Sequence, residues 1–235
     1  MEFENKIPCI IKGEGKPLIF LHGFMCAKEY FAPQINYFSK WFKVIAYDLY
    51  GFGESKPEKA YSLNDYADEF LSIASEFNEK VSVVAHSFGC RVIFKSALKS
   101  NLIDRAVLCG VAGLKPSFSL KKSFKRTAYK LSKPFFTREV LERRFFSTDY
   151  NLLNGVMKDS FKIVTSEFFD DKLTDINIPT LAIFGDKDDQ TPCKIANKLT
   201  KEMPNCTKHI MKDCGHFCFA ENPREFNGLV KEFLL

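Results

Sequence analysis

Short apolar runs alternate along this chain with longer segments in which apolar residues recur every three or four positions. A run such as 18–21, bounded by turn residues, is typical of a strand buried on both faces of a parallel sheet. The pattern predicts strands at 17–22, 43–48, 80–86, 104–110, 179–185 and 206–212, and helices at about 28–40, 63–77, 88–99, 193–203 and 222–234. Before residue 17 there is room only for a short hairpin at about 3–12. Because alternating strands and helices form parallel βαβ units, we predict an α/β fold: a doubly wound, mostly parallel sheet with helices on both faces.

One long segment, 114–178, interrupts this alternation. Two apolar stripes at helical spacing lie within it. The first consists of Leu120, Phe124, Ala128 and Leu131, and the second of Leu152, Leu153, Val156, Met157, Phe161 and Val164. We therefore predict a core formed by 1–113 and 179–235, with a helical cap inserted at 114–178. Most apolar cap residues are expected to pack against the rim of the sheet, and a minority to line a pocket.

The bulk composition is that of an ordinary globular protein. With 235 residues, 46% hydrophobic and 27% charged, the chain is long enough for one domain with a substantial core. No apolar run approaches the ~20 residues that cross a bilayer. The first residues, Met-Glu-Phe-Glu-Asn-Lys, are acidic and polar, unlike a signal peptide. We expect a cytoplasmic protein without a membrane span.

Positive charge is concentrated in one part of the predicted cap. Residues 115–144 hold ten Lys or Arg against Glu139 and Glu142, a local charge of +8, whereas the whole chain carries +5. Such a run is usually a solvated face; the alternative is that it steers an acidic partner or a charged ligand tail. No nucleic-acid recognition motif accompanies it, so we expect no nucleic-acid partner.

The cysteines do not follow the spacing of a metal site. They are scattered, without paired C-x-x-C motifs, at Cys9, Cys26, Cys90, Cys109, Cys193, Cys206, Cys214 and Cys218. Cys214 and Cys218 flank His216, which is the arrangement closest to a ligand cluster. We interpret the cysteines as free thiols in a reducing compartment, and we expect neither a metal nor a cofactor.

The segment 85–89, Ala-His-Ser-Phe-Gly, carries the clearest chemical signal. It joins a strand-like run at 81–84 to a helical stretch at 91–98. A serine on a sharp strand-to-helix turn, with small residues two positions before and after it, forms a nucleophile elbow. The turn exposes the Ser87 hydroxyl, and the following helix directs its N-terminal N–H groups at whatever the serine attacks. The alternative is an ordinary turn serine.

Three further segments lie at the carboxyl ends of predicted strands, where α/β sheets bind ligands. They are a His-Gly-Phe turn at 22–24, an acidic loop at 185–192 and a Gly-His loop at 213–217. Serine, acid and histidine thus follow the chain order of the α/β-hydrolases. From about residue 13 to the C-terminus, the chain resembles that superfamily in its small, capped, single-domain form.

The resemblance implies a Ser-His-Asp triad. Ser87 takes the place of the nucleophile, and His216 that of the base that accepts its proton. The acidic loop offers three carboxylates, Asp186, Asp188 and Asp189. In the family pattern, the acid stands in Gly-x-x-Asp with a proline four residues later. Gly185 and Pro192 fit that pattern around Asp188, which we therefore predict as the acid.

The resemblance also implies roles for residues around the triad. The backbone N–H groups of Phe24 and Phe88 are expected to form the oxyanion hole. Arg91, four residues after Ser87, matches an arginine of relatives that handle carboxylate-bearing substrates, including the menaquinone-pathway lyase. It either binds such a carboxylate or ties its helix to a neighbouring loop. His22 is a further candidate for substrate binding or for a structural hydrogen bond.

Together these residues indicate a serine hydrolase that cleaves a small-molecule carboxylic ester, or a thioester, through an acyl-enzyme. A lyase or carbon–carbon hydrolase that acts on a carboxylated substrate with the same triad is the alternative, and a non-catalytic ligand receptor is a third. We do not expect a haloalkane dehalogenase, because its elbow needs an aspartate nucleophile at the position where this chain has Ser87. The basic cap is also similar to that of the biotin-pathway esterase, which implies an acidic acyl carrier protein as a partner.

Overall fold

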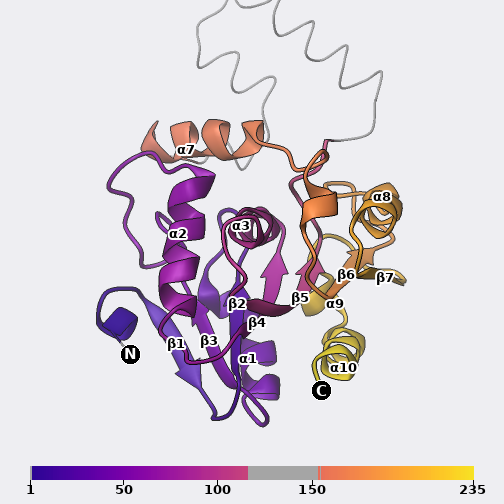
Figure 1. Cartoon of the computed structure of the whole chain (residues 1–235), viewed down its shortest axis with the longest axis horizontal. Helices are drawn as coiled ribbons and strands as arrows, with labels where there is room; N and C mark the ends of the chain where they lie inside the picture. The colour runs from indigo at the N-terminus through magenta and orange to yellow at the C-terminus, as the bar shows by residue number, and fades with distance from the viewer. Residues whose placement is uncertain (1, 116–152, 154) are drawn as a thin grey trace, which may run out of the picture.

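The computed structural model describes residues 2–115, 153 and 155–235, and their strands form one seven-stranded sheet (Figure 1). The strands lie side by side in the order β1-β3-β2-β4-β5-β6-β7. β1 pairs antiparallel with β3, whereas the pairings from β3 through β7 are parallel. The strands are β1 (Cys9–Lys12), β2 (Pro17–Leu21), β3 (Lys43–Tyr47), β4 (Val81–His86), β5 (Ile103–Cys109), β6 (Thr180–Gly185) and β7 (Cys206–Met211).

Helices cover both faces of this sheet, as the sequence predicts. Because successive side chains of a strand point to opposite faces, Leu18 and Phe20 of β2 pack with α1, α9 and α10, while Ile19 and Leu21 pack with α2, α3 and α8. The helical elements are η1 (Glu2–Asn5), η2 (Lys28–Phe31), α1 (Ala32–Phe38), α2 (Leu63–Ala74), α3 (Phe88–Ala97), α7 (Gly155–Ser166), η3 (Leu173–Asp175), α8 (Lys194–Glu202), α9 (Cys218–Glu221) and α10 (Pro223–Leu234).

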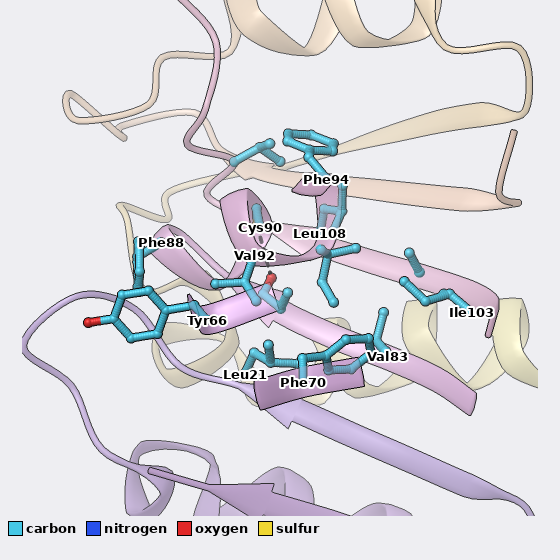
Figure 2. Close-up of a cluster of buried hydrophobic side chains, with 14 of the residues drawn as sticks. Leu21, Tyr66, Phe70, Val83, Phe88, Cys90, Val92, Phe94, Ile103 and Leu108 are labelled. Atoms are coloured by element: carbon cyan, nitrogen blue, oxygen red, sulfur yellow. Dashed lines mark hydrogen bonds between the residues drawn. The ribbon is translucent and has the colours of Figure 1, made fainter. Parts of the chain in front are cut away.

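The apolar cluster beneath α3 fixes the turn between β4 and α3. Figure 2 shows its side chains, which come from β2, β4, β5, α2 and α3. Phe70, Val83, Val92 and Leu108 are all completely or almost completely buried there. β4 ends at His86 and α3 begins at Phe88. The packing on both sides therefore holds Ser87 at the carboxyl edge of the sheet.

Two predictions for the N-terminal third are wrong. Residues 3–12 form no hairpin in the described structure, because β1 is a single strand that pairs with β3. After it the chain turns at Gly13, whose φ is 82° and where a Cβ would lie 2.3 Å from the Ser39 carbonyl oxygen. The helix expected at 28–40 is split into η2 and α1, because Pro33 in the first turn of α1 lacks the N–H that would continue the helix.

Of the predicted cap, residues 114, 115, 153 and 155–178 are described, and they include α7 and η3. Outside the described residues lie Leu120, Phe124, Ala128, Leu131 and Leu152. Met157 and Val164 of α7 are buried, as predicted, whereas Val156 is 39% exposed and lies off the packed face. The boundaries 114–178 of the cap stay a prediction. None of the described helices is long and apolar enough to cross a bilayer.

Candidate active site

Ser87 has a strained backbone conformation. Its φ of 50° and ψ of −107° lie where non-glycine residues are rare, and its N–H donates to the Cys109 carbonyl oxygen at 2.9 Å. Two residues later, a Cβ on Gly89 would lie 2.6 Å from the Leu21 carbonyl oxygen, so only glycine fits there. Ala85, two residues earlier, is fully buried in β4. The turn therefore has the geometry of a nucleophile elbow.

His216 and Asp188 form a buried hydrogen-bonded pair. His216 Nδ1 lies 2.7 Å from Asp188 Oδ2, and the two side chains are 7% and 0% exposed. Asp188 stands in the loop between β6 and α8, and His216 in the loop between β7 and α9. Because the carboxylate only accepts hydrogen bonds, it holds the proton on Nδ1 and leaves Nε2 of the neutral ring as an acceptor.

Asp188 is also held by its own loop. The N–H groups of Gln190 and Thr191 donate to Oδ1 at 2.8 and 2.9 Å, and the Thr191 hydroxyl donates to Oδ2 at 2.6 Å. Burial acts to raise the pKa of Asp188, but the hydrogen bonds from His216 and Thr191 outweigh it, so the pKa lies below its ordinary value. Thr191 is not among the residues predicted from the sequence, although the Asp-x-x-Thr spacing is a local signal for this hydrogen bond.

His86 supports the loop that carries His216. Its Nε2 donates to the His216 carbonyl oxygen at 2.9 Å, and the two ring centroids lie 4.7 Å apart. Burial, assisted by the neighbouring His216, lowers the pKa of His86 to about 3, so this ring stays neutral at ordinary pH. His86 therefore helps to hold in place the loop that carries His216.

Ser87 and His216 line the same pocket, which has a volume of about 690 Å³. Around them the lining includes Phe24, Met25, Phe88, Arg91, Phe161 and Gln190. Within the described residues no hydrogen bond joins the Ser87 hydroxyl to His216. In serine hydrolases the hydrogen bond between serine and histidine is often long in the free enzyme and tightens when substrate binds. Nowhere in the described ranges do three or more His, Cys, Asp or Glu side chains form a group suited to a metal.

Phe24 and Phe88, whose N–H groups are predicted to form the oxyanion hole, both line this pocket. Phe88 opens α3, so its N–H is one of the donors that a helix N-terminus leaves without an intrahelical partner. Phe24 follows Gly23, where a Cβ would lie 2.8 Å from His86 Nδ1 and 3.4 Å from Ser87 Cβ. Both residues thus lie next to Ser87, and their role stays a prediction.

His22 is placed for structure. Its Nε2 accepts a hydrogen bond from the Leu49 N–H at 3.1 Å, and its Nδ1 donates to the Gly23 carbonyl oxygen at 2.8 Å. The ring is 1% exposed, and burial lowers its pKa. Both ring nitrogens are therefore engaged with backbone, which favours the structural interpretation of His22 over substrate binding.

Arg91 joins α3 to the last turn of α7 and to the residue that follows it. Its Nη1 donates to the carbonyl oxygens of Val164 and Glu167 at 3.0 and 2.5 Å, and its guanidinium lies 5.5 Å from the Phe168 ring centroid. Burial lowers the pKa of Arg91 to about 10, which leaves it cationic at neutral pH. These contacts favour the helix-to-loop role, although Arg91 also lines the pocket.

Comparisons with known proteins identify the family of this chain. Residues 18–229 match the family described as "Alpha/beta hydrolase family". The pimeloyl-[acyl-carrier protein] methyl ester esterase of Pectobacterium atrosepticum is 24% identical over 92% of this chain and 93% of its own length. The (E)-2-((N-methylformamido)methylene)succinate hydrolase of Acinetobacter baylyi is 25% identical over 95% and 92%.

A solved structure extends the likeness to three dimensions. The meta-cleavage product hydrolase of Pseudomonas fluorescens IP01 superimposes with a TM-score of 0.73 and 25% identity, covering 96% of this chain and 92% of that one. Since the family match spans most of the sequence and the sheet is mostly parallel, as predicted, this chain belongs to the alpha/beta hydrolase family and is a hydrolase.

Proposed function

We propose that this chain is a serine hydrolase that cleaves a carboxylic ester, or a thioester, of a small molecule through an acyl-enzyme on Ser87. One observation carries the proposal: His216, held by the buried Asp188, lines the same pocket as Ser87. Nucleophile, base and acid are the three parts that such catalysis requires. The pimeloyl-[acyl-carrier protein] methyl ester esterases among the relatives add support.

In this mechanism His216 Nε2 accepts the proton of the Ser87 hydroxyl as Oγ attacks the acyl carbon. The N–H groups of Phe24 and Phe88 donate to the oxyanion that develops. The imidazolium, stabilised by Asp188, then gives the proton to the departing alcohol or thiol. Water next loses a proton to His216, attacks the acyl-enzyme and releases the acid, and Ser87 recovers its proton.

The pocket walls favour an apolar acyl group. Phe24 lies edge-on to three neighbouring rings, with centroid distances of 4.7 Å to Phe52, 5.3 Å to Phe88 and 5.2 Å to Phe161. Walls of this kind bind apolar groups by removing them from water. We therefore propose that the acyl chain packs against the three rings that line the pocket, Phe24, Phe88 and Phe161, while its carbonyl carbon reaches Ser87.

A fluorophosphonate probe, which reacts with activated serines, tests the assignment of the nucleophile. We expect the probe to label Ser87, and Ser87→Ala to lose both labelling and ester hydrolysis, with kcat lower by ~10⁴-fold or more. Ser72→Ala, on the exposed side of α2, is the matched control and keeps both. Labelling of another residue, with full hydrolysis in Ser87→Ala, would contradict the proposal.

Arg91 supports a second candidate function, a lyase or carbon–carbon hydrolase acting on a carboxylated substrate with the same triad. Its buried cation lines the pocket, and the relatives include a meta-cleavage product hydrolase. A panel of apolar esters and carboxylated carbon–carbon substrates separates the two functions. Preference for carboxylated substrates that Arg91→Gln abolishes and Arg91→Lys retains favours the second. Thermal unfolding of both variants controls for the lost helix-to-loop contacts.

The partner and the compartment are further parts of the proposal. We propose that the basic segment 115–144 docks an acidic acyl carrier protein, supported by its charge and by relatives named for acyl-carrier-protein esters. Of its ten basic residues, Lys115 lies within the described structure. We place the enzyme in the cytoplasm, where its eight free thiols would stay reduced.

A further inference from the structure

Two buried thiols meet directly behind the proposed active site. The sulfur atoms of Cys109 and Cys218 lie 3.1 Å apart, and both residues are 0% exposed. This separation is only about 1.1 Å longer than an S–S bond of ~2.05 Å. The two residues are 109 positions apart in the chain, so the fold itself brings them together.

Each thiol is attached to one half of the proposed catalytic machinery. Cys109 ends β5, and its carbonyl oxygen accepts the Ser87 N–H at 2.9 Å. Cys218 opens α9, two residues after His216. His216 in turn packs on Gly110, where a Cβ would lie 3.0 Å from its Cε1. A bond between the sulfurs would therefore tie the strand that supports the nucleophile to the loop that carries the base.

We propose that Cys109 and Cys218 are a redox modification site, at which hydrogen peroxide forms a reversible disulfide that lowers turnover by displacing His216. No step of the proposed ester hydrolysis uses either thiol. Because both sulfurs are buried, we propose a small, uncharged oxidant that reaches them through local opening at the four-residue α9.

The chemistry balances with one peroxide. The Cys218 thiolate attacks the O–O bond and becomes a sulfenic acid, and the hydroxide that leaves takes the proton that Cys218 lost, which forms one water. The Cys109 sulfur then attacks the sulfenic sulfur and expels a second water. Cys218 is placed first because it opens the short α9, whereas Cys109 lies in the inner strand β5 and so acts as the resolving thiol. Burial, with the neighbouring Cys218, also raises the pKa of Cys109 well above its ordinary value.

When the disulfide closes, we expect the loop between β7 and α9, which carries His216, to move while the sheet stays in place. β5 is an inner strand, paired with β4 and β6, whereas α9 has four residues and follows a loop. Closing the remaining ~1.1 Å moves Cys218 and with it His216, whose ring must stay between Asp188 and Ser87. A misplacement of about 1 Å in a catalytic group costs up to ~10²-fold in rate. We expect kcat to fall by about 10- to 100-fold and KM to change little.

The test compares reduced and peroxide-treated protein by peptide mass mapping and by ester hydrolysis. We expect a Cys109–Cys218 disulfide, a lower kcat, and recovery of both with dithiothreitol. Two variants, Cys218→Ser and Cys109→Ala, each remove one sulfur and so prevent the disulfide. Each should hydrolyse the ester normally and keep its kcat after peroxide, and either variant alone is a sufficient test. Cys206→Ser, on the edge strand β7, is the matched control and should respond like the wild type.

The outcomes are separable. A Cys90–Cys109 disulfide, or oxidation confined to other cysteines, overturns the site. A Cys109–Cys218 disulfide with unchanged kcat overturns its coupling to His216. If the proposed ester hydrolysis itself is wrong, the reduced protein is inactive before any peroxide is added, while the mass mapping still decides whether the disulfide forms.

Discussion

At the scale of single residues, three carboxylates of one loop differ in their burial and in their hydrogen bonds. They are Asp186, Asp188 and Asp189. The Asp188 side chain is completely buried and accepts hydrogen bonds from both His216 and Thr191. Asp186 and Asp189 are exposed. Burial next to the imidazole is what a triad acid needs, so this contrast supports Asp188 in the proposed mechanism.

Exchanging each carboxylate for an amide tests that contrast. Asp188→Asn keeps the size of the side chain but no longer holds His216 in the tautomer that leaves Nε2 free, so we expect kcat to fall by ~10²–10⁴-fold. Asp186→Asn and Asp189→Asn serve as matched controls and should stay near the wild type. Steady-state kinetics on one ester measure all three. A larger loss in Asp186→Asn would show that the family pattern was applied to the wrong aspartate.

Thr191 is expected to act through Asp188. Thr191→Val preserves shape but removes the hydroxyl that donates to Oδ2 at 2.6 Å, so the pKa of Asp188 rises toward its ordinary value. A carboxyl whose folded pKa is lowered contributes stability that is present above its unfolded pKa and is lost as pH falls through the folded one. We expect the variant to lose about 1–2 kcal/mol of unfolding free energy at neutral pH.

The pH dependence separates this effect from a simple packing loss. The difference between Thr191→Val and the wild type should shrink as pH falls from about 4 through the lowered pKa of Asp188, because the carboxyl becomes protonated first in the variant and then in the wild type. Urea unfolding across this pH range measures it. Thr200→Val in α8, whose hydroxyl donates to the Ala196 carbonyl oxygen, is the control. Its effect should not depend on pH, and equal pH dependence in both variants would contradict the role of Thr191.

At the scale of helices and strands, a feature can be predicted from the sequence when it depends on residues close together in the chain, and not when it depends on distant ones. Strands buried on both faces leave an uninterrupted apolar run such as 18–21, which is readable locally. The four-residue α9 is too short to show a helical period. The support of His216 by His86 joins residues 130 positions apart, so no local pattern carries it. Likewise, β1 joins the sheet by pairing with β3, more than 30 residues further along the chain, and no local pattern shows this pairing.

The start of α2 offers a test of local signals. Ser62 accepts the Asp65 N–H through its hydroxyl, and Asp65 accepts the Ser62 N–H at 2.7 Å, which together form a capping box. Ser62→Ala should therefore lower the free energy of unfolding by about 0.5–2 kcal/mol. Ser75→Ala at the other end of α2, where the hydroxyl bonds to the Ser72 carbonyl oxygen, is the matched control. Similar losses in both variants would argue against the cap.

At the scale of the whole molecule, the proposed triad residues and the start of the basic segment 115–144 lie at the same edge of the sheet. The proposed triad residues follow the carboxyl ends of β4, β6 and β7, where parallel sheets place their sites. The basic segment 115–144 begins shortly after the carboxyl end of β5, at that same edge. Lys16 and Lys80 precede β2 and β4 and so lie at the opposite edge. Charge that steers a partner to the site should act from the first edge only.

Reversing the charge of basic residues at each edge tests whether only the first edge steers a partner. The variant carries glutamate in place of Lys121, Lys122, Lys125 and Arg126, which lie outside the described residues. For an ester on an acidic carrier protein we expect a KM about 10-fold higher and an unchanged kcat, because these charges act on encounter and not on the transition state. The effect should shrink as salt rises from ~0.05 to ~0.5 M, where the Debye length falls from about 14 to about 4 Å. A neutral short-chain ester should not respond, and neither should Lys16→Glu combined with Lys80→Glu on the carrier-linked ester. Equal kinetics of the variant and the wild type on both substrates at low salt would make the segment a solvated face and remove the carrier protein from the proposal.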